Sequence, residues 1–156
     1  MRRRSFYLGL VILVLAGVAR AASEPIYDES ADAKKEIAAA IREASRHRPL
    51  RNVVLVFGGN WCKDCRALDA QMHERDLAAL LAKDFVVVKI DIGRMDKNLD
   101  LAAKFGVPIK NGVPALAVLN SRGQLLYAQD QGQFADARHM SPESIKAFFE
   151  QWKPQD

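Results

Sequence analysis

Two apolar segments separated by a helix-forming stretch limit the folds that this chain can adopt. Residues 52–57 and 85–92 are rich in β-branched side chains and are predicted to be buried strands. The stretch between them favours a helix from Cys62 to about Ala82. A strand, a helix and a second strand in this order predict a right-handed crossover between parallel strands. The chain is therefore expected to be an α/β protein.

The remaining elements are expected to complete a small mixed sheet flanked by helices. Further helices are predicted at 30–48, 96–105 and from 142 onward, and further strands at 115–119 and 124–128. Ser141 is placed to cap the last helix, with Pro142 at its first position. Asn120 to Gly123 form a hairpin turn between the last two strands. Ile26 and Tyr27 are expected to form one short edge strand.

The beginning of the chain has the pattern of a signal peptide. A basic Arg2-Arg3-Arg4 precedes an apolar stretch from Phe6 to Ala19, and Ala19-Arg20-Ala21 offers a small-x-small cleavage site. The apolar stretch is shorter than the roughly 20 residues that a spanning helix needs, although a retained anchor is the alternative. We expect a signal peptide at 1–21, a loose leader at 22–29 and one domain at 30–156.

The charge balance gives no reason to expect a nucleic-acid partner. The sequence has 23 basic and 19 acidic residues, and four of the arginines lie within residues 1–21. Without that segment the numbers of basic and acidic residues are equal, so the basic excess belongs to the expected signal peptide. The expected product is an exported protein, periplasmic in a bacterium with two membranes.

The only two cysteines, Cys62 and Cys65, lie where the first strand gives way to the following helix. Their spacing places both thiols on one face of the first helical turn, close enough to form a disulfide. The positive end of the helix dipole favours the reactive thiolate of Cys62. This arrangement favours thiol–disulfide chemistry.

Two structural alternatives for the cysteine pair are weaker. A cross-link over so short a loop would stabilise the fold by only about 2 kcal/mol, against roughly 3 kcal/mol for a fifteen-residue loop. A structural zinc ion usually needs four ligands, and the three histidines lack the spacing that would complete such a site: His47, His73 and His139. No metal is expected.

Three sequence features together resemble the thioredoxin superfamily over about residues 30–153. They are the motif Trp61-Cys62-x-x-Cys65, Lys89 on the next strand, and Gly112-Val113-Pro114 followed by an apolar strand. The resemblance implies a thioredoxin-like fold, a cis bond before Pro114 and a catalytic pair that needs no cofactor. A second Gly-Val-Pro ends at Pro108, but no strand follows it, so the cis-proline role is assigned to Pro114.

The chain departs from the family pattern behind the cysteines. Val56 occupies the position of a buried aspartate that helps proton transfer in thioredoxins. Lys89 is therefore expected to lack its carboxylate neighbour, and it either supports the site or extends from the sheet edge to water. Asp64, inside the motif, could supply a carboxylate near the sulfurs. Its charge would oppose the Cys62 thiolate, whereas Lys63 would favour it.

The resemblance implies a protein thiol–disulfide oxidoreductase. Cys62 would attack a substrate disulfide, and Cys65 would then resolve the mixed disulfide. Trp61, Val113 and Pro114 would hold the substrate backbone. A reductase or electron relay is favoured over a strong oxidant. The protein is expected to be a monomer that exchanges electrons with a thiol donor or acceptor, and to contact the membrane only through such a redox partner. The alternative is a binding or assembly factor without turnover, for instance in cytochrome or copper-protein maturation, with Cu(I) held by the thiolates as a variant.

Overall fold

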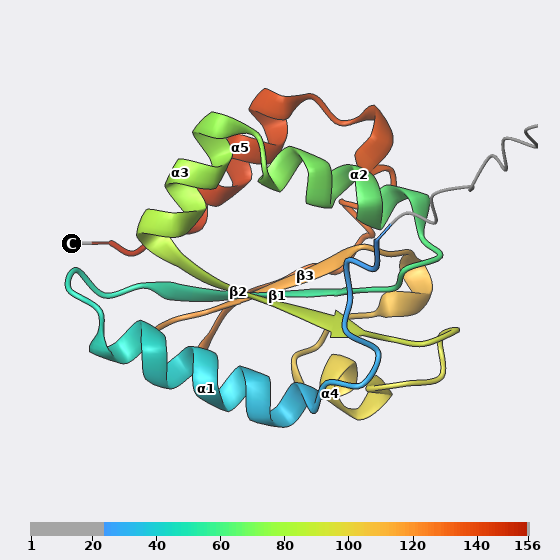
Figure 1. Cartoon of the computed structure of the whole chain (residues 1–156), viewed down its shortest axis with the longest axis horizontal. Helices are drawn as coiled ribbons and strands as arrows, with labels where there is room; N and C mark the ends of the chain where they lie inside the picture. Colours follow the sequence, from blue (N-terminus) through green and yellow to red (C-terminus); the bar gives the residue numbers. More distant parts are fainter. Residues whose placement is uncertain (1–23, 156) are drawn as a thin grey trace, which may run out of the picture.

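The computed structural model describes residues 24–155, which form a four-stranded sheet between two layers of helices (Figure 1). One face of the sheet is covered by α1 (Ala33–Arg46) and α4 (Leu99–Lys104). The other face is covered by α2 (Lys63–Met72), α3 (Arg75–Asp84) and α5 (Pro142–Trp152). This is the predicted α/β arrangement of a small sheet flanked by helices. The expected signal peptide, residues 1–21, lies outside the described residues.

The strands run in the order β2-β1-β3-β4, and their bounds are Asn52–Gly58 (β1), Phe85–Asp91 (β2), Ala115–Leu119 (β3) and Leu125–Ala128 (β4). Strands β1 and β2 pair in parallel, which confirms the predicted crossover connection. Strands β3 and β4 form the predicted antiparallel hairpin, and β3 also pairs antiparallel with β1. Short 3-10 turns occur at Ile109–Asn111 (η1) and Ala137–His139 (η2). The sheet is therefore mixed, with β2 at one edge.

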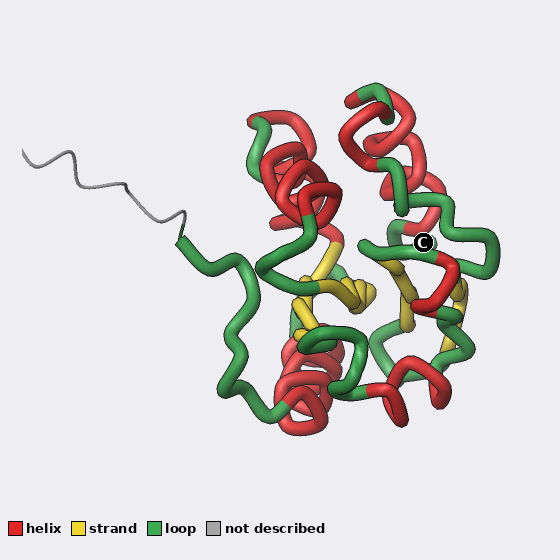
Figure 2. Tube along the Cα trace, turned by 90° about the vertical axis from the view of Figure 1, so that its right-hand side faces the viewer, coloured by secondary structure: helices red, strands yellow, loops and turns green. Residues whose placement is uncertain are grey.

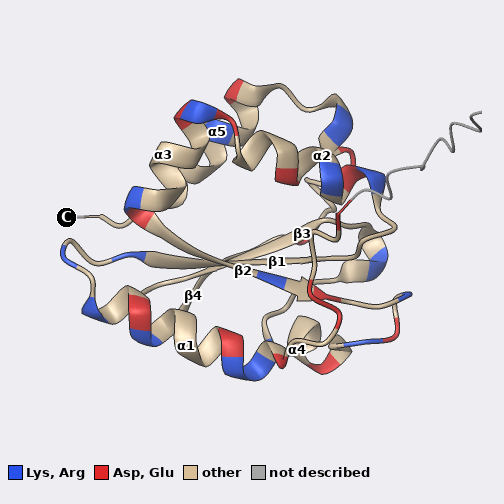
Figure 3. Cartoon of the chain, viewed as in Figure 1, with Lys and Arg blue, Asp and Glu red and all other residues tan. Residues whose placement is uncertain are grey.

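The core consists of two apolar layers separated by the sheet. Every residue of β1 is buried, because helices cover both faces of this central strand. Figure 2 shows the strands between the two helical layers, and Figure 3 shows charges of both signs on the helices while the strands carry few. On the α5 side, Phe85, Phe148 and Phe149 stack edge to face. Burial on both faces explains why strands β1 and β3 are continuous apolar runs.

Side-chain caps mark the starts of two helices, and the cap of α5 is the one that the sequence predicts. The Ser141 hydroxyl accepts a hydrogen bond from the backbone N–H of Ser144 at 3.1 Å, and Pro142 begins α5. Asp32 caps α1 in the same way through the N–H of Lys35 at 3.1 Å. Helix α1 is shorter at both ends than expected. Helix α4 starts only at Leu99, because Asn98 adopts a left-handed conformation with φ of 55°.

The prediction of one continuous helix from Cys62 to about Ala82 is wrong. Helix α2 ends at Met72, and Glu74 has an extended conformation with ψ of 140° before α3 begins at Arg75. Met72 and Leu77 both belong to the core layer under α5. In one straight helix these positions would point about 140° apart. The break turns both side chains toward the same core.

The first described residues are packed against the domain. We expected a loose leader here with a short strand at Ile26 and Tyr27, but the structure has no strand at these positions. Instead the Asn60 side chain binds the backbone of both residues, and the Tyr27 side chain is 2 % exposed. A single aromatic anchor in a polar segment leaves no periodic pattern, which explains why the sequence did not reveal it. Within residues 24–155, no helix is long and apolar enough to cross a membrane.

Candidate active site

Cys62 and Cys65 form a disulfide at the start of α2, with their Cα atoms 5.2 Å apart. Cys62 is the N-cap residue, and its sulfur lies 3.0 Å from the backbone nitrogen of Cys65, which points an N–H at it. Such N–H groups at a helix start stabilise negative charge on a thiolate. Both residues are almost buried, with exposed fractions of 5 % and 2 %. Their surroundings, more than their exposure, therefore distinguish the two sulfurs.

The loop before β3 lies against the Cys62 sulfur. The Val113–Pro114 peptide bond is cis, as the sequence predicts, and the Val113 carbonyl oxygen lies 3.4 Å from Cys62 Sγ. Pro108 leads into the short turn η1 instead of a strand, which agrees with the assignment of Pro114. The structure thus brings Val113 and Pro114 beside the reactive sulfur, although Val113 lies 51 positions after Cys62 in the chain.

Trp61 forms an exposed rim next to the disulfide. Its side chain is 43 % exposed, and its indole Nε1 donates a hydrogen bond to the Gly93 carbonyl oxygen at 2.6 Å. This bond ties the ring to the loop that follows β2. The ring is therefore fixed in orientation while much of its surface is open to a partner.

Asp64 is paired with Arg138, which lies 74 positions later in the chain. Its Oδ1 accepts hydrogen bonds from the backbone nitrogen of Arg138 at 3.1 Å and from the guanidinium Nε at 3.0 Å. Burial alone would raise the pKa of the Asp64 carboxyl, but these two bonds and the Arg138 charge outweigh it and hold the pKa below its usual range. Arg138 compensates the negative charge that would otherwise oppose a thiolate on Cys62.

Lys89 does have a carboxylate neighbour, contrary to our expectation. Its ammonium group forms an ion pair with Asp69 on α2. Asp69 lies four residues after Cys65, so both side chains emerge on the same side of α2, and that side faces β2. The carboxylate comes from the helix and not from strand β1, where Val56 lies opposite Lys89 in the sheet register.

Comparisons with known proteins agree with this geometry. A family model described as thioredoxin-like matches residues 32–121. The chain belongs to the thioredoxin-like family. No curated protein sequence matches the chain. The family and the paired cysteines together support thiol–disulfide oxidoreductase chemistry.

Among solved structures, the chain is similar to a disulphide isomerase from Xylella fastidiosa Temecula1, at 44 % identity and a TM-score of 0.78. That match covers 83 % of this chain and 98 % of the isomerase. The oxidised C-terminal domain of DsbD from Neisseria meningitidis matches at 20 % identity and a TM-score of 0.54, over 79 % and 97 % of the two chains. A thioredoxin from Thermus thermophilus matches at 18 % identity and a TM-score of 0.54, over 73 % of this chain and 81 % of the thioredoxin. The latter two matches show the fold alone.

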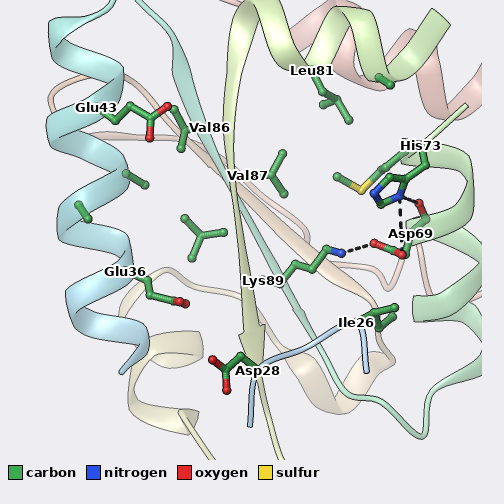
Figure 4. A pocket seen from close by; sticks show the side chains of 15 residues that line it. Ile26, Asp28, Glu36, Glu43, Asp69, His73, Leu81, Val86, Val87 and Lys89 are labelled. Carbon is green, nitrogen blue, oxygen red and sulfur yellow. Dashed lines mark hydrogen bonds and ion pairs between the residues drawn. The ribbon is translucent and has the colours of Figure 1, made fainter. Parts of the chain in front are cut away.

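A cavity of about 620 Å³ lies beside the thioredoxin-like site, at the open edge of β2 (Figure 4). Lys89 and Asp69 border it on one side, and His73 contacts Asp69 there. Glu36 and Glu43 of α1 border the opposite side. Within the described part of the chain, no three histidine, cysteine or acidic side chains are grouped to hold a metal ion.

The sequence did not single out four residues that shape this site: Tyr27, Asn60, Asp69 and Arg138. Asp69 could have been found, because its four-residue spacing from Cys65 places it on the same helix face. The other three act through contacts that no local pattern encodes. Asn60, for example, binds residues that lie 33 and 34 positions earlier in the chain.

Proposed function

We propose that this protein is a thiol–disulfide oxidoreductase that acts through Cys62 and Cys65 on exported proteins. The observation that carries the proposal is the placement of Cys62. Its sulfur caps α2 and lies beside the Val113 carbonyl, and the exposed Trp61 directly precedes it in the chain. The 44 % identical relative described as a disulphide isomerase supports the same chemistry.

The reaction would proceed by two thiol–disulfide exchanges. The Cys62 thiolate attacks one sulfur of a substrate disulfide, forms a mixed disulfide and releases the other substrate sulfur as a thiolate, which takes up a proton. The Cys65 thiol then loses its proton and attacks Cys62 Sγ, and the second substrate sulfur leaves with that bonding pair and is protonated. The substrate gains two electrons and two protons, and the Cys62–Cys65 pair becomes a disulfide.

Trp61, Val113 and Pro114 would position the substrate. An extended peptide beside the loop could pair with the Val113 backbone, while the Trp61 ring covers the approach to Cys62. Asp64, with its charge compensated by Arg138, would leave the Cys62 thiolate favoured. Lys89 and Asp69 would support the inner side of the site as an ion pair.

We favour a reductase or electron relay that exchanges electrons with a thiol donor or acceptor and acts as a monomer. Reduction potentials of related cysteine pairs span about 150 mV, which corresponds to about 7 kcal/mol for two electrons. The potential of the Cys62–Cys65 pair, measured against glutathione or dithiothreitol buffers, decides the direction. A value near that of a strong oxidant would overturn this assignment.

Export is proposed on the pattern of residues 1–21, with a mature chain that begins near Ala22 and functions in the periplasm of a bacterium with two membranes. The intact mass of the exported protein checks this. A mass that still includes Arg2 to Ala21, in a membrane fraction, would contradict it.

Trapping of partners tests the oxidoreductase function. Cys65→Ser removes the thiol that resolves the mixed disulfide, so adducts through Cys62 should persist until an external thiol arrives. Acid-quenched samples on non-reducing gels should show adducts that dithiothreitol removes. Cys62→Ser is the matched control and should trap few partners. Equal, thiol-independent recovery of partners by wild type and the double serine variant would favour the binding or assembly factor instead.

A further inference from the structure

Gly58, the last residue of β1, leaves a small space behind the disulfide. A Cβ atom at this position would lie 2.7 Å from Cys65 Sγ and would overlap the hydroxyl oxygen of Tyr27. Both atoms therefore border the same narrow gap, which is too small for a methyl group. The Tyr27 side chain is 2 % exposed, so its hydroxyl lies inside the protein next to the second cysteine.

The residue directly before the redox motif holds Tyr27 in this position. Asn60, which immediately precedes Trp61 and Cys62, accepts a hydrogen bond from the Tyr27 backbone nitrogen at 2.9 Å. Its amide nitrogen donates to the Tyr27 carbonyl oxygen at 3.0 Å. The same Asn60 oxygen binds the Ile26 N–H at 2.8 Å. Tyr27 is thus fixed to the loop that carries the cysteines.

The surroundings keep the Tyr27 hydroxyl protonated. Burial raises the pKa of Tyr27 well above its ordinary value, and the carboxylates of Asp69 and Asp91 raise it further. A phenol with such a pKa remains a hydrogen-bond donor over the whole range in which thiols titrate.

We propose that the Tyr27 hydroxyl donates a hydrogen bond to the Cys65 sulfur when that sulfur carries negative charge, and so favours the Cys65 thiolate in the resolving step. The proposal rests on the proposed oxidoreductase function. In that step the Cys65 S–H bond breaks, its proton goes to water, and the thiolate forms the Cys62–Cys65 bond. The substrate sulfur leaves with the electron pair of the broken bond and takes a proton from water. Tyr27 keeps its own proton throughout.

The charged groups around the gap make a neutral donor useful. Asp69 on α2 and Asp91 at the end of β2 both oppose a thiolate on Cys65. Each is partly compensated, Asp69 by Lys89 and Asp91 by Lys97 at 3.1 Å. On the outer side, Asp64 is paired with Arg138, and Lys63 is exposed. Val56 supplies no polar group, so Tyr27 brings a hydroxyl to the buried side of Cys65.

Tyr27→Phe tests the proposal because it removes only the hydroxyl and keeps the ring that fills the core. The readout is the pH titration of the Cys65 13Cβ resonance in the reduced full chain, assigned with the Cys62→Ser variant. We expect the pKa of Cys65 to rise by about one unit, a tenfold shift toward the thiol. The pKa of Cys62 should change much less.

Tyr127→Phe is the matched control, since Tyr127 lies on β4 and packs against Phe148 and Trp152. It should leave both thiol pKa values unchanged. A folded Tyr27→Phe protein with an unchanged Cys65 pKa would overturn the proposal, and so would an equal shift in the Tyr127 variant.

A kinetic measurement separates this proposal from the proposed function. The lifetime of the mixed disulfide with a small peptide disulfide should increase about threefold in Tyr27→Phe, because the Cys65 thiolate is about tenfold rarer but about threefold more nucleophilic at the higher pKa. The first attack by Cys62 should keep its rate. If the wild-type protein forms no mixed disulfide, the oxidoreductase function fails. The thiol titration still decides the role of Tyr27 in that case.

Discussion

The two bonded sulfurs of the disulfide face different kinds of surroundings. Cys62 lies among backbone groups, namely the N–H groups that begin α2 and the carbonyl of Val113. Cys65 faces the Tyr27 side chain across the space left by Gly58. Backbone geometry persists through most side-chain substitutions, whereas the Cys65 environment depends on which side chains are present. Substitutions should therefore change the properties of Cys65 more easily than those of Cys62.

Gly58→Ala should have the largest effect on the packing around Cys65. The new methyl group would overlap the Tyr27 hydroxyl and crowd Cys65 Sγ in a fully packed core. We expect a loss of about 3 kcal/mol in the free energy of unfolding, measured by urea denaturation. The double variant with Tyr27→Phe should recover part of this loss, because it removes the hydroxyl oxygen, the nearest of the atoms that the methyl group would overlap. Stability within about 0.5 kcal/mol of wild type would show that the gap has room for a methyl group.

Asn60→Ala tests whether the position of Tyr27 affects the pKa of the Cys65 thiol. The substitution removes the side-chain bonds to the backbone of Ile26 and Tyr27. We expect a loss of about 2 kcal/mol, together with a raised Cys65 pKa as Tyr27 loses its fixed position. Asn111→Ala is the control, since its amide makes one exposed bond to the Asp130 carbonyl at 2.9 Å. Equal effects of the two variants would contradict a specific link between Asn60 and Cys65.

Substitutions near Cys62 should have smaller effects, and these should come from a change in charge. Arg138→Met leaves the Asp64 carboxylate without its guanidinium partner, next to the start of α2. We expect the pKa of the Cys62 thiol to rise by about half a unit, or about 0.7 kcal/mol, with little change at Cys65. Thiol titration by NMR measures both values. Arg122→Met, which removes a positive charge in the β3–β4 turn, should move neither. A larger shift at Cys65 than at Cys62 would reverse the comparison.

Local signals account for what the sequence could predict. Apolar runs defined β1 and β2, Asn120 to Gly123 defined the hairpin, and the Ser141 cap fixed the start of α5. The cysteine pair and Pro114 were also found, because each belongs to a short motif. The break after Met72 was not predicted, because residues on both sides favour a helix and only packing against the core requires the turn.

Several side-chain contacts around the cysteines could be found only in the folded chain. Tyr27 and Asn60 are 33 positions apart, and Asp64 and Arg138 are 74 positions apart. Neither pair shares a spacing that a helix or strand period would reveal. The expectation that Lys89 lacks a carboxylate was wrong for a related reason. The family pattern places the carboxylate on β1, whereas the carboxylate of Asp69 lies on α2.

The position of β2 at the edge of the sheet affects whether copies of the protein can pair strand to strand. An edge strand of seven residues offers backbone groups to any extended chain, which is how sheets from different molecules join and aggregate. Lys89 places a charge on this strand, and Glu36 and Glu43 border the cavity beside it. Charged side chains at an edge oppose such pairing. The Lys89 side chain, which pairs with Asp69 on α2, thus puts a charge at the edge where another strand would have to pair.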